Sequence, residues 1–315
     1  MRKLNFICAA LLMAVAPFSM AKDVIKLIVP TSPGGGTDTL FRAIAKYAEP
    51  YLDATIVIQN ASGAGGTIGV SELTRAKPDG LTMAGVWMGP ITVAPHSMNV
   101  TYGMDDYIPV IQIDSAPYVL CVRKDFPADN GKQFIAELKK HPGKYTYGTD
   151  GVAGPGQLSI ERVFKALGVT ARDIPYKGAG ETMPALLSRV VDIYSGSVPP
   201  AVSMEKSGEA KCLLATSADP VPALPDAMGL KALGIPEKQT MLWHGIIVPK
   251  GTPKDKVLKI QQAFEKAADS PEMVAFFKTA GVAKAIETGD VFKQHIQDEY
   301  KQMGEMVKIL GLDRR

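Results

Sequence analysis

Short apolar runs alternate with segments of helical periodicity from residue 24 onward. Val24–Val29, Thr55–Ile58 and Leu81–Val86 predict strands, because each is a short apolar run beside turn-forming residues. Helical spacing of apolar residues fills the two intervals between them. The apolar faces of these two predicted helices carry Leu40, Phe41, Ile44, Tyr47 and Tyr51 in the first and Ile68, Leu73 and Ala76 in the second. This βαβαβ alternation predicts a mostly parallel sheet flanked by helices.

The same alternation restarts after Asp125. The elements predicted there are a helix with Phe134, Ile135 and Leu138, strands at Tyr145–Tyr147, Val191–Tyr194 and Lys211–Thr216, and helices ending at Arg189 and around Ala201–Lys206. A Pro-rich loop at 219–236 precedes a returning strand and two amphipathic helices, at 253–268 and about 290–310. We expect the chain to cross between lobes near 115–122 and 240–248. The prediction is two Rossmann-like α/β lobes, residues 22–116 plus 245–315 and residues 117–244, with a ligand cleft between them.

The first 21 residues have the pattern of a secretory signal peptide. Arg2 and Lys3 precede an apolar run from Phe6 to Phe18, and small residues before Ala21 mark a cleavage site. The mature chain is therefore expected to begin near Lys22 in the periplasm. The full chain has 35 basic and 32 acidic residues, so loss of the two basic residues of the signal leaves it nearly neutral. A nearly neutral chain offers no electrostatic basis for binding nucleic acid.

Two cysteines, Cys121 and Cys212, remain after removal of the signal, and each lies in an apolar run. An exported compartment permits a disulfide. Cysteine also behaves as a small buried apolar residue, and the sequence favours buried free thiols over a disulfide.

A glycine-rich segment occurs three times between a predicted strand and a predicted helix. The segments are Ser32–Asp38, Asn60–Gly69 and Gly148–Gln157, the first two in one lobe and the third in the other. Ligands of open α/β sheets lie beyond the carboxyl ends of the strands. Helix N-termini there present free N–H groups and a positive dipole end, which together bind anions. One such loop is usually ordinary turn chemistry, but three facing one cleft favour an anion site.

The expected anion is a small carboxylate rather than a nucleotide. None of the three segments has the lysine of a phosphate-binding P-loop. GAGGTIG (63–69) nearly fits the dinucleotide pattern, but Ile68 occupies a glycine position and no acidic residue ends the next strand. Asp38, beside the first glycine run, would repel a phosphate unless its carboxylate turned back to cap the helix.

Catalysis has little support in the sequence, and no cofactor, metal or catalytic residue is expected. There is no nucleophile elbow, and the four histidines, at 96, 141, 244 and 295, lack metal-ligand spacing. Three residues of the second lobe are candidates for the far side of the cleft: Tyr176 as a hydroxyl or ring wall, Lys177 as a cation and Ser195 as a hydroxyl donor. Two of them have an ordinary alternative, in the core for Tyr176 and in solvent for Lys177.

The chain resembles the Bug-type (TctC-like) solute receptors of tripartite tricarboxylate transporters. The likeness rests on PGGGTD (33–38), NASGAGGTIG (60–69), KPDG (77–80), PYKG (175–178) and LWHGIIVPKGTP (242–253), in this order along essentially the whole mature chain. It implies a type II periplasmic binding protein fold, capture of a small carboxylate and delivery to membrane permease subunits. The ligand-contacting residues that it implies are Ser32, Gly34, Gly35, Gly36, Thr37, Ser62, Gly63, Ala64, Gly65, Thr149, Asp150 and Gly154.

The sequence departs from the family pattern in the third loop. Gln157 occupies the place where many members have a histidine, and Asp150 adds an acidic residue. These departures leave the distal end of the ligand open, so dicarboxylates, citrate-like acids and aromatic acids all stay candidates. A monomeric transport receptor is the leading hypothesis. A receptor that feeds a sensor kinase is the alternative, and a periplasmic enzyme acting on carboxylates is disfavoured because no nucleophile–base pair is evident.

Overall fold

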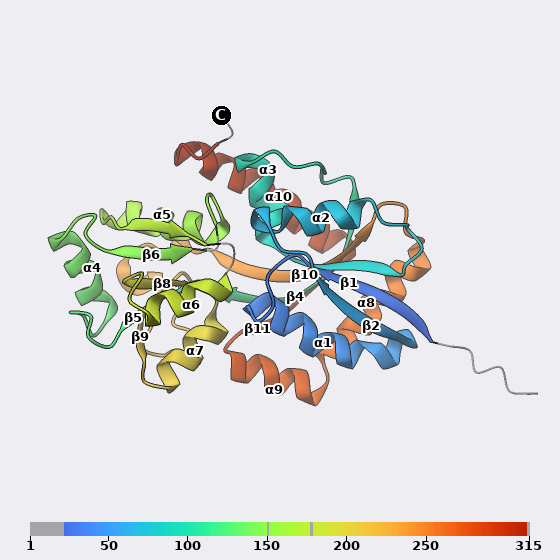
Figure 1. The fold of residues 1–315 in the computed structure, drawn as a ribbon, viewed down its shortest axis with the longest axis horizontal. Helices are drawn as coiled ribbons and strands as arrows, with labels where there is room; N and C mark the ends of the chain where they lie inside the picture. The colour runs from blue at the N-terminus through green and yellow to red at the C-terminus, as the bar shows by residue number, and fades with distance from the viewer. Residues whose placement is uncertain (1–21, 150, 177–178, 314–315) are drawn as a thin grey trace, which may run out of the picture.

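The structure is a computed structural model that describes residues 22–149, 151–176 and 179–313, and it contains two sheets (Figure 1). The predicted signal peptide, residues 1–21, lies outside the described residues. Within the described ranges, no helix combines the length and the apolar character that crossing a bilayer requires.

The first sheet has six strands in the order β11-β4-β10-β3-β1-β2. Its strands are β1 (Asp23–Val29), β2 (Ala54–Asn60), β3 (Thr82–Trp87), β4 (Tyr107–Pro117), β10 (Met241–Pro249) and β11 (Ala283–Thr288). β1 pairs in parallel with β2 and β3. β10 is antiparallel to β3 and β4, and β11 is antiparallel to β4. The prediction of a mostly parallel sheet is right for β1–β3 and wrong for the half that the crossing and returning strands build.

The second sheet has five strands in the order β7-β6-β8-β5-β9. These are β5 (Val119–Arg123), β6 (Thr146–Thr149), β7 (Arg172–Pro175), β8 (Ile193–Gly196) and β9 (Ala210–Ala215). The sheet is parallel from β7 to β8 and antiparallel around β5. Each sheet therefore has a parallel part whose strand ends carry glycine loops.

Helices flank both sheets (Figure 1). The helices of the first sheet and its loops are α1 (Gly36–Leu52), α2 (Thr67–Thr74), α3 (Ala94–Ser97), α8 (Lys254–Ala268), α9 (Pro271–Ala280) and α10 (Gly289–Ile309), with a 3₁₀ turn at Ala64–Gly66 and a π-helical turn at Gly89–Val93. Those of the second are α4 (Gly131–Lys140), α5 (Pro155–Leu167), α6 (Ala179–Leu187) and α7 (Val198–Lys206), with 3₁₀ turns at Leu230–Leu233 and Pro236–Lys238.

The sequence interpretation missed α9 and β11, although the signals for α9 are present. Ser270 accepts a hydrogen bond from the main-chain N–H of Met273 as a helix cap, Pro271 opens the helix, and Gly281 ends it with φ of +68°. The predicted burial also needs two corrections. Tyr51 is 47% exposed because the next residue, Leu52, takes the core-facing position, and Ile68 is 52% exposed.

The chain crosses between the sheets at two neighbouring places. β4 ends at Pro117 in the first sheet and β5 starts at Val119 in the second. The return leads into β10, whose first residue pairs with the last of β4. Thr216 joins both crossings: its hydroxyl accepts from the N–H of Tyr118 at 2.9 Å and donates to the carbonyl of Thr240 at 2.8 Å. These contacts support the predicted lobes, whose boundaries stay a prediction.

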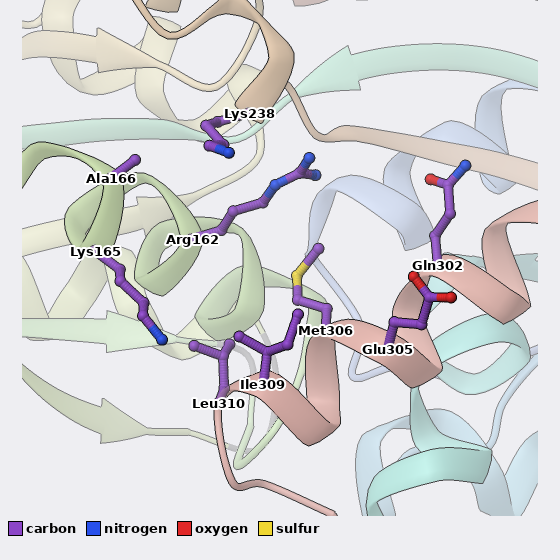
Figure 2. Close-up of a pocket in the computed structure, with 9 residues that line it drawn as sticks. All are labelled: Arg162, Lys165, Ala166, Lys238, Gln302, Glu305, Met306, Ile309 and Leu310. Atoms are coloured by element: carbon purple, nitrogen blue, oxygen red, sulfur yellow. The ribbon is translucent and has the colours of Figure 1, made fainter.

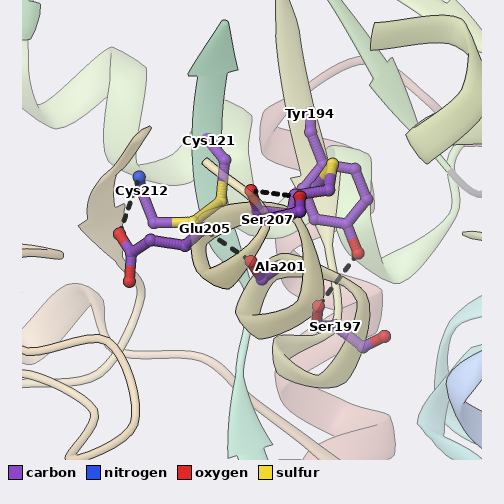
Figure 3. Close-up of a disulfide and its surroundings, with 8 residues drawn as sticks. Cys121, Tyr194, Ser197, Ala201, Glu205, Ser207 and Cys212 are labelled. Atoms are coloured by element: carbon purple, nitrogen blue, oxygen red, sulfur yellow. Dashed lines mark hydrogen bonds between the residues drawn. A yellow bond between two sulfur atoms is a disulfide. The ribbon is translucent and has the colours of Figure 1, made fainter. Parts of the chain in front are cut away.

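The two cysteines form a disulfide between the neighbouring strands β5 and β9 (Figure 3). Cys121 and Cys212 are direct register partners across this antiparallel pair. The expectation of free thiols is therefore wrong, because two apolar strands that are far apart in the sequence bring the cysteines face to face. Both side chains are buried, so the disulfide lies within the hydrophobic core beside the second sheet.

Candidate ligand-binding site

The first glycine loop, between β1 and α1, is held by the carboxylate of Asp38. Its Oδ2 accepts from the N–H of Gly34 at 2.9 Å and from Nε of Arg42 at 2.9 Å, and its Oδ1 accepts from Asn60 at 2.8 Å. Burial opposes ionisation, but the hydrogen bonds from Arg42, Gly34 and Asn60 outweigh it and lower the pKa of Asp38. The carboxylate thus turns back onto the loop, which is the capping role that the sequence offered for Asp38.

The second glycine loop begins where that network ends. Asn60, the last residue of β2, also donates to the carbonyl of Thr31 at 3.0 Å, so the first two loops are held side by side. Four successive residues, 63 to 66, have positive φ, and only Ala64 among them is not glycine. A Cβ on Gly66 would lie 2.7 Å from the Trp87 ring, so packing explains that glycine. Packing does not explain Gly65, where a Cβ would meet only the end of Met98 at 3.9 Å.

The third glycine loop, between β6 and α5, has the same cap as the first. Gly154 is the residue before α5, and Gln157 Oε1 accepts from the N–H of Ala153 at 2.6 Å. Gln157, predicted to contact ligand, therefore closes the loop on itself. Thr149 is fully buried and donates its hydroxyl to Asp173 at 2.6 Å, and burial raises the pKa of that carboxyl to about 6. The side chain of Thr149 is thus held by Asp173, and its contact with a ligand stays a prediction.

A cavity of about 220 Å³ lies between the second and third loops. Main chain of Gly63–Gly65 and Gly151–Gly154 lines it from the two sheets. The remaining lining residues are Trp87, Gly89, Val93, Ala94, Met98, Pro155 and Tyr176. None of these described lining residues carries a charge. The cavity therefore joins the two glycine loops that precede α2 and α5 to an apolar wall that includes Trp87, Val93 and Met98, which the sequence interpretation missed.

The first loop faces the second sheet at a different place. None of the predicted residues from Ser32 to Thr37 lines the cavity between the other two loops. A Cβ on Gly36 would lie 2.8 Å from Oγ of Ser197, at the start of α7. The cleft that the sequence predicts for all three loops together stays a prediction, and the first loop lies against Ser197 at the start of α7. Direct ligand contact by Ser32, Gly34, Gly35, Gly36 and Thr37 stays a prediction.

The other predicted residues fall into three groups. Tyr176 lines the cavity, and its buried hydroxyl has no hydrogen-bond partner among the described residues. Ser195 is 2% exposed and its hydroxyl also lacks a partner there, but it does not line the cavity, and neither does the exposed Ser62. Asp150 and Lys177 lie outside the described residues.

A hydroxyl, an imidazole and a carboxylate form a hydrogen-bonded chain beside the first loop. Thr37 Oγ1 lies 3.0 Å from His244 Nε2, and His244 Nδ1 lies 2.8 Å from Asp114 Oδ1. No sequence signal indicated a base beside a hydroxyl, since these residues are far apart along the chain. The order of groups matches a nucleophile, base and orienting acid. Thr37 does not line the cavity between the second and third loops.

A larger hollow of about 620 Å³ lies between α5 and the end of α10 (Figure 2). Arg162, Lys165 and Lys238 stand on one side of it, and Met306, Ile309 and Leu310 on the other. Arg162 donates to the carbonyls of Glu237 and Gln239 at 2.8 and 3.3 Å. None of the described residues that line this hollow belongs to a glycine loop. Among the described residues, no group of three or more histidine, cysteine or acidic side chains could hold a metal ion.

Comparisons with solved structures agree with this fold. The structure of the periplasmic binding protein BugD is similar, with a TM-score of 0.87 and 28% identity over 94% of this chain and 100% of that one. MatC from Rhodopseudomonas palustris, with bound malate, has a TM-score of 0.82 and 26% identity over 90% of this chain and 99% of that one. R. palustris Rpa4515, with adipate, has a TM-score of 0.86 and 25% identity over 92% and 97%.

Sequence relatives agree as well. The chain is 32% identical to a UPF0065 protein of Bordetella pertussis over 91% of this chain and 90% of that protein. The model of the tripartite tricarboxylate transporter family receptor matches residues 40–312. The chain therefore belongs to the TctC family of tripartite tricarboxylate transporter receptors.

Proposed function

We propose that this protein is a periplasmic receptor that holds one small carboxylate between its second and third glycine loops. The observation that carries the proposal is the cavity at Gly63–Gly65 and Gly151–Gly154, whose described lining residues carry no charge and belong to the loops that precede α2 and α5. Helix N-termini attract anions through their free N–H groups and their positive dipole end. A carboxylate suits such a site because it spreads a single charge over two acceptor oxygens.

The wall of the cavity supports a ligand with an apolar body. Trp87, Val93 and Met98 come from the first sheet and its loops, and Tyr176 adds a ring and a hydroxyl from the second. About 220 Å³ is below the usual range of sites for drug-sized ligands. We therefore propose an aromatic or short aliphatic acid, held by its carboxylate at the loops and by its carbon skeleton at Trp87. The malate and adipate complexes of MatC and Rpa4515 support an acid of this size.

The proposed role is capture and delivery. Loops from both sheets line the cavity, so a ligand that bridges them favours the state in which the lobes are closed. We propose that the closed monomer then delivers the acid to the membrane permease subunits of a tripartite tricarboxylate transporter. The disulfide of Cys121 and Cys212 supports the periplasmic location, because disulfides persist in oxidising compartments.

A thermal-shift screen of the mature protein against aromatic, dicarboxylic and tricarboxylic acids tests the proposal. A true ligand raises the melting temperature according to its concentration and affinity. Gly65→Ala should remove this shift, because a methyl group enters the cavity and the backbone at φ of +62° is strained. Loss of a hydrogen bond to a charged group, about 1.5–3 kcal/mol, corresponds to an affinity at least about tenfold lower.

Gly168→Ala is the matched control. Gly168 has nearly the same φ, +64°, at the end of α5, and a Cβ there would meet nothing within 4 Å. Both variants therefore have similar strain, about 1 kcal/mol, but only one alters the cavity. Full binding by the Gly65 variant, or equal loss in both variants, would contradict the site.

A further inference from the structure

The hydrogen-bonded chain Thr37–His244–Asp114 lies beside the first glycine loop and outside the lining of the cavity. His244 is 5% exposed and Asp114 is 2% exposed, so two polar side chains are kept inside the first sheet. Asp114 Oδ1 accepts from Nδ1 of His244 at 2.8 Å and also from the main-chain N–H of His244 at 3.0 Å. Phe41 of α1 packs edge-on against the imidazole, with ring centroids 6.1 Å apart. The ring is therefore held from two sides.

The donor and acceptor roles follow from Asp114. A carboxylate only accepts hydrogen bonds, so Nδ1 of His244 carries the proton that it donates to Asp114. In the neutral ring Nε2 is then an acceptor, and the hydroxyl of Thr37 donates to it. This arrangement fixes the direction of the Thr37 hydroxyl and the rotamer that carries it. Thr37 is the second residue of α1, so the first turn of this helix is fixed with it.

The position of the histidine links this turn to the crossings. Asp114 lies on β4 and His244 on β10, the two strands that lead into the second sheet. The β4–β10 pairing has a register shift between His244 and Gly245, so the ladder is irregular where the side-chain bond joins the strands. A movement of one crossing strand relative to the other would therefore alter the support of Thr37.

We infer that His244, oriented by Asp114, is a positioning residue that fixes the Thr37 hydroxyl and thereby couples the first glycine loop to the two crossing strands. The backbone of the first loop is then held in one conformation beside Ser197, which lies at the start of α7 in the other lobe. This inference goes beyond the proposed function and does not depend on it. The positioning itself is a property of the protein without ligand.

Hydrogen–deuterium exchange of the ligand-free protein tests the positioning. His244→Phe and Thr37→Val should each speed amide exchange in residues 34–39 by about fivefold, the factor that corresponds to one hydrogen bond of about 1 kcal/mol. Thr37→Ser keeps the hydroxyl and should exchange like the wild type. His141→Phe, at the end of α4 in the other sheet, is the matched control for loss of a histidine and should leave residues 34–39 unchanged.

Nitrogen-15 NMR of the histidine side chains gives a signature that a merely structural contact would not give. The wild type should show His244 protonated at Nδ1 and unprotonated at Nε2, and Asp114→Asn should remove this fixed tautomer. Wild-type exchange in Thr37→Val would overturn the inference, and so would a proton on Nε2 of His244. Because no ligand is added, a negative acid screen would refute the proposed function and leave this result standing.

Discussion

The first and third glycine loops begin their helices in the same way but with opposite consequences for charge. The residues before the helices, Gly35 and Gly154, have nearly the same backbone angles, φ −73° with ψ 168° and φ −74° with ψ 162°. In each loop the third helical residue accepts the N–H of the residue before the cap. That acceptor is the carboxylate of Asp38 in the first loop and the amide of Gln157 in the third.

This difference in charge predicts different roles for the two loops, a structural one for the first and anion binding for the third. Asp38 places a negative charge at the start of α1, and Arg42 and Asn60 complete a closed network around it. Gln157 satisfies the same kind of N–H without charge, so the dipole at the start of α5 is left for an anion. A glycine loop after a strand is therefore not a binding loop by pattern alone. We expect the charge of the capping side chain to influence how readily each helix start takes an external anion.

Removal of the disulfide should cause the largest loss of stability. It should speed amide exchange in the third loop more than in the first. Replacing Cys121 and Cys212 by alanine opens a covalent loop with a sequence separation of 91 residues. A disulfide around a loop of this length contributes about 4–5 kcal/mol in the chain-entropy description. We expect a loss of this order in urea unfolding, with faster amide exchange in the second sheet and the third loop. Equal exchange changes in β1 and the first loop would contradict the independence of the two regions.

Asp38→Asn should come next and should act on stability rather than on binding. The variant weakens three hydrogen bonds to a charged acceptor, and we expect a loss of about 1.5–3 kcal/mol of unfolding free energy. The pKa of Asp38 is lower in the folded chain than its ordinary value of 3.8. The ionised Asp38 therefore contributes fully to the free energy of unfolding above pH 3.8. This contribution is lost as the pH falls through the pKa that Asp38 has in the folded chain.

Urea unfolding of the wild type and of the Asp38 variant between pH 2.5 and 7 measures this difference (the range is about one unit below the ordinary aspartate pKa to neutrality). The two curves should converge at the acidic end. A constant difference at every pH would mean that shape, not charge, sets the role of Asp38. An affinity loss as large as that of the Gly65 variant would place the ligand at the first loop.

Gln157→Glu should have the smallest effect on stability and a selective effect on binding. The glutamate can still accept the N–H of Ala153, so the loop should keep its cap. Its added charge beside the start of α5 would repel a bound carboxylate, and we expect about tenfold weaker binding, which is about 1.4 kcal/mol. Titration calorimetry with the best acid from the screen measures this. Unchanged affinity would show that the anion does not bind near α5.

Much of the frame was predictable because its signals are local. β1, β2 and β3 and their glycine loops follow one another along the chain, and Asp38, the cap of α1, lies beside the first of these loops. The crossings were also predictable, since the C-terminal helices follow a returning strand. These predictions rest on periodicity and turn chemistry, which neighbouring residues carry.

The contacts within the site were less predictable, because topology sets them. Trp87 and Met98 line the cavity only because β3 ends where β6 ends in the other sheet. Thr37 and His244 are 207 residues apart, and no spacing in the sequence links them. The cysteines pair because β9 lies beside β5, which a strand assignment alone does not reveal. Trp87 did have one signal, its place at the carboxyl end of a parallel strand, where ligands collect.

Thr216 gives the two crossings a common pivot. It is fully buried, and its main chain also pairs with Tyr118 and Thr240, so one residue has hydrogen bonds to both polypeptide passages. If the lobes move apart while these hydrogen bonds stay intact, they rotate about Thr216. Sliding of one half past the other would break them. The hydrogen bonds of Thr216 therefore favour rotation of the two lobes over sliding, with or without a bound solute.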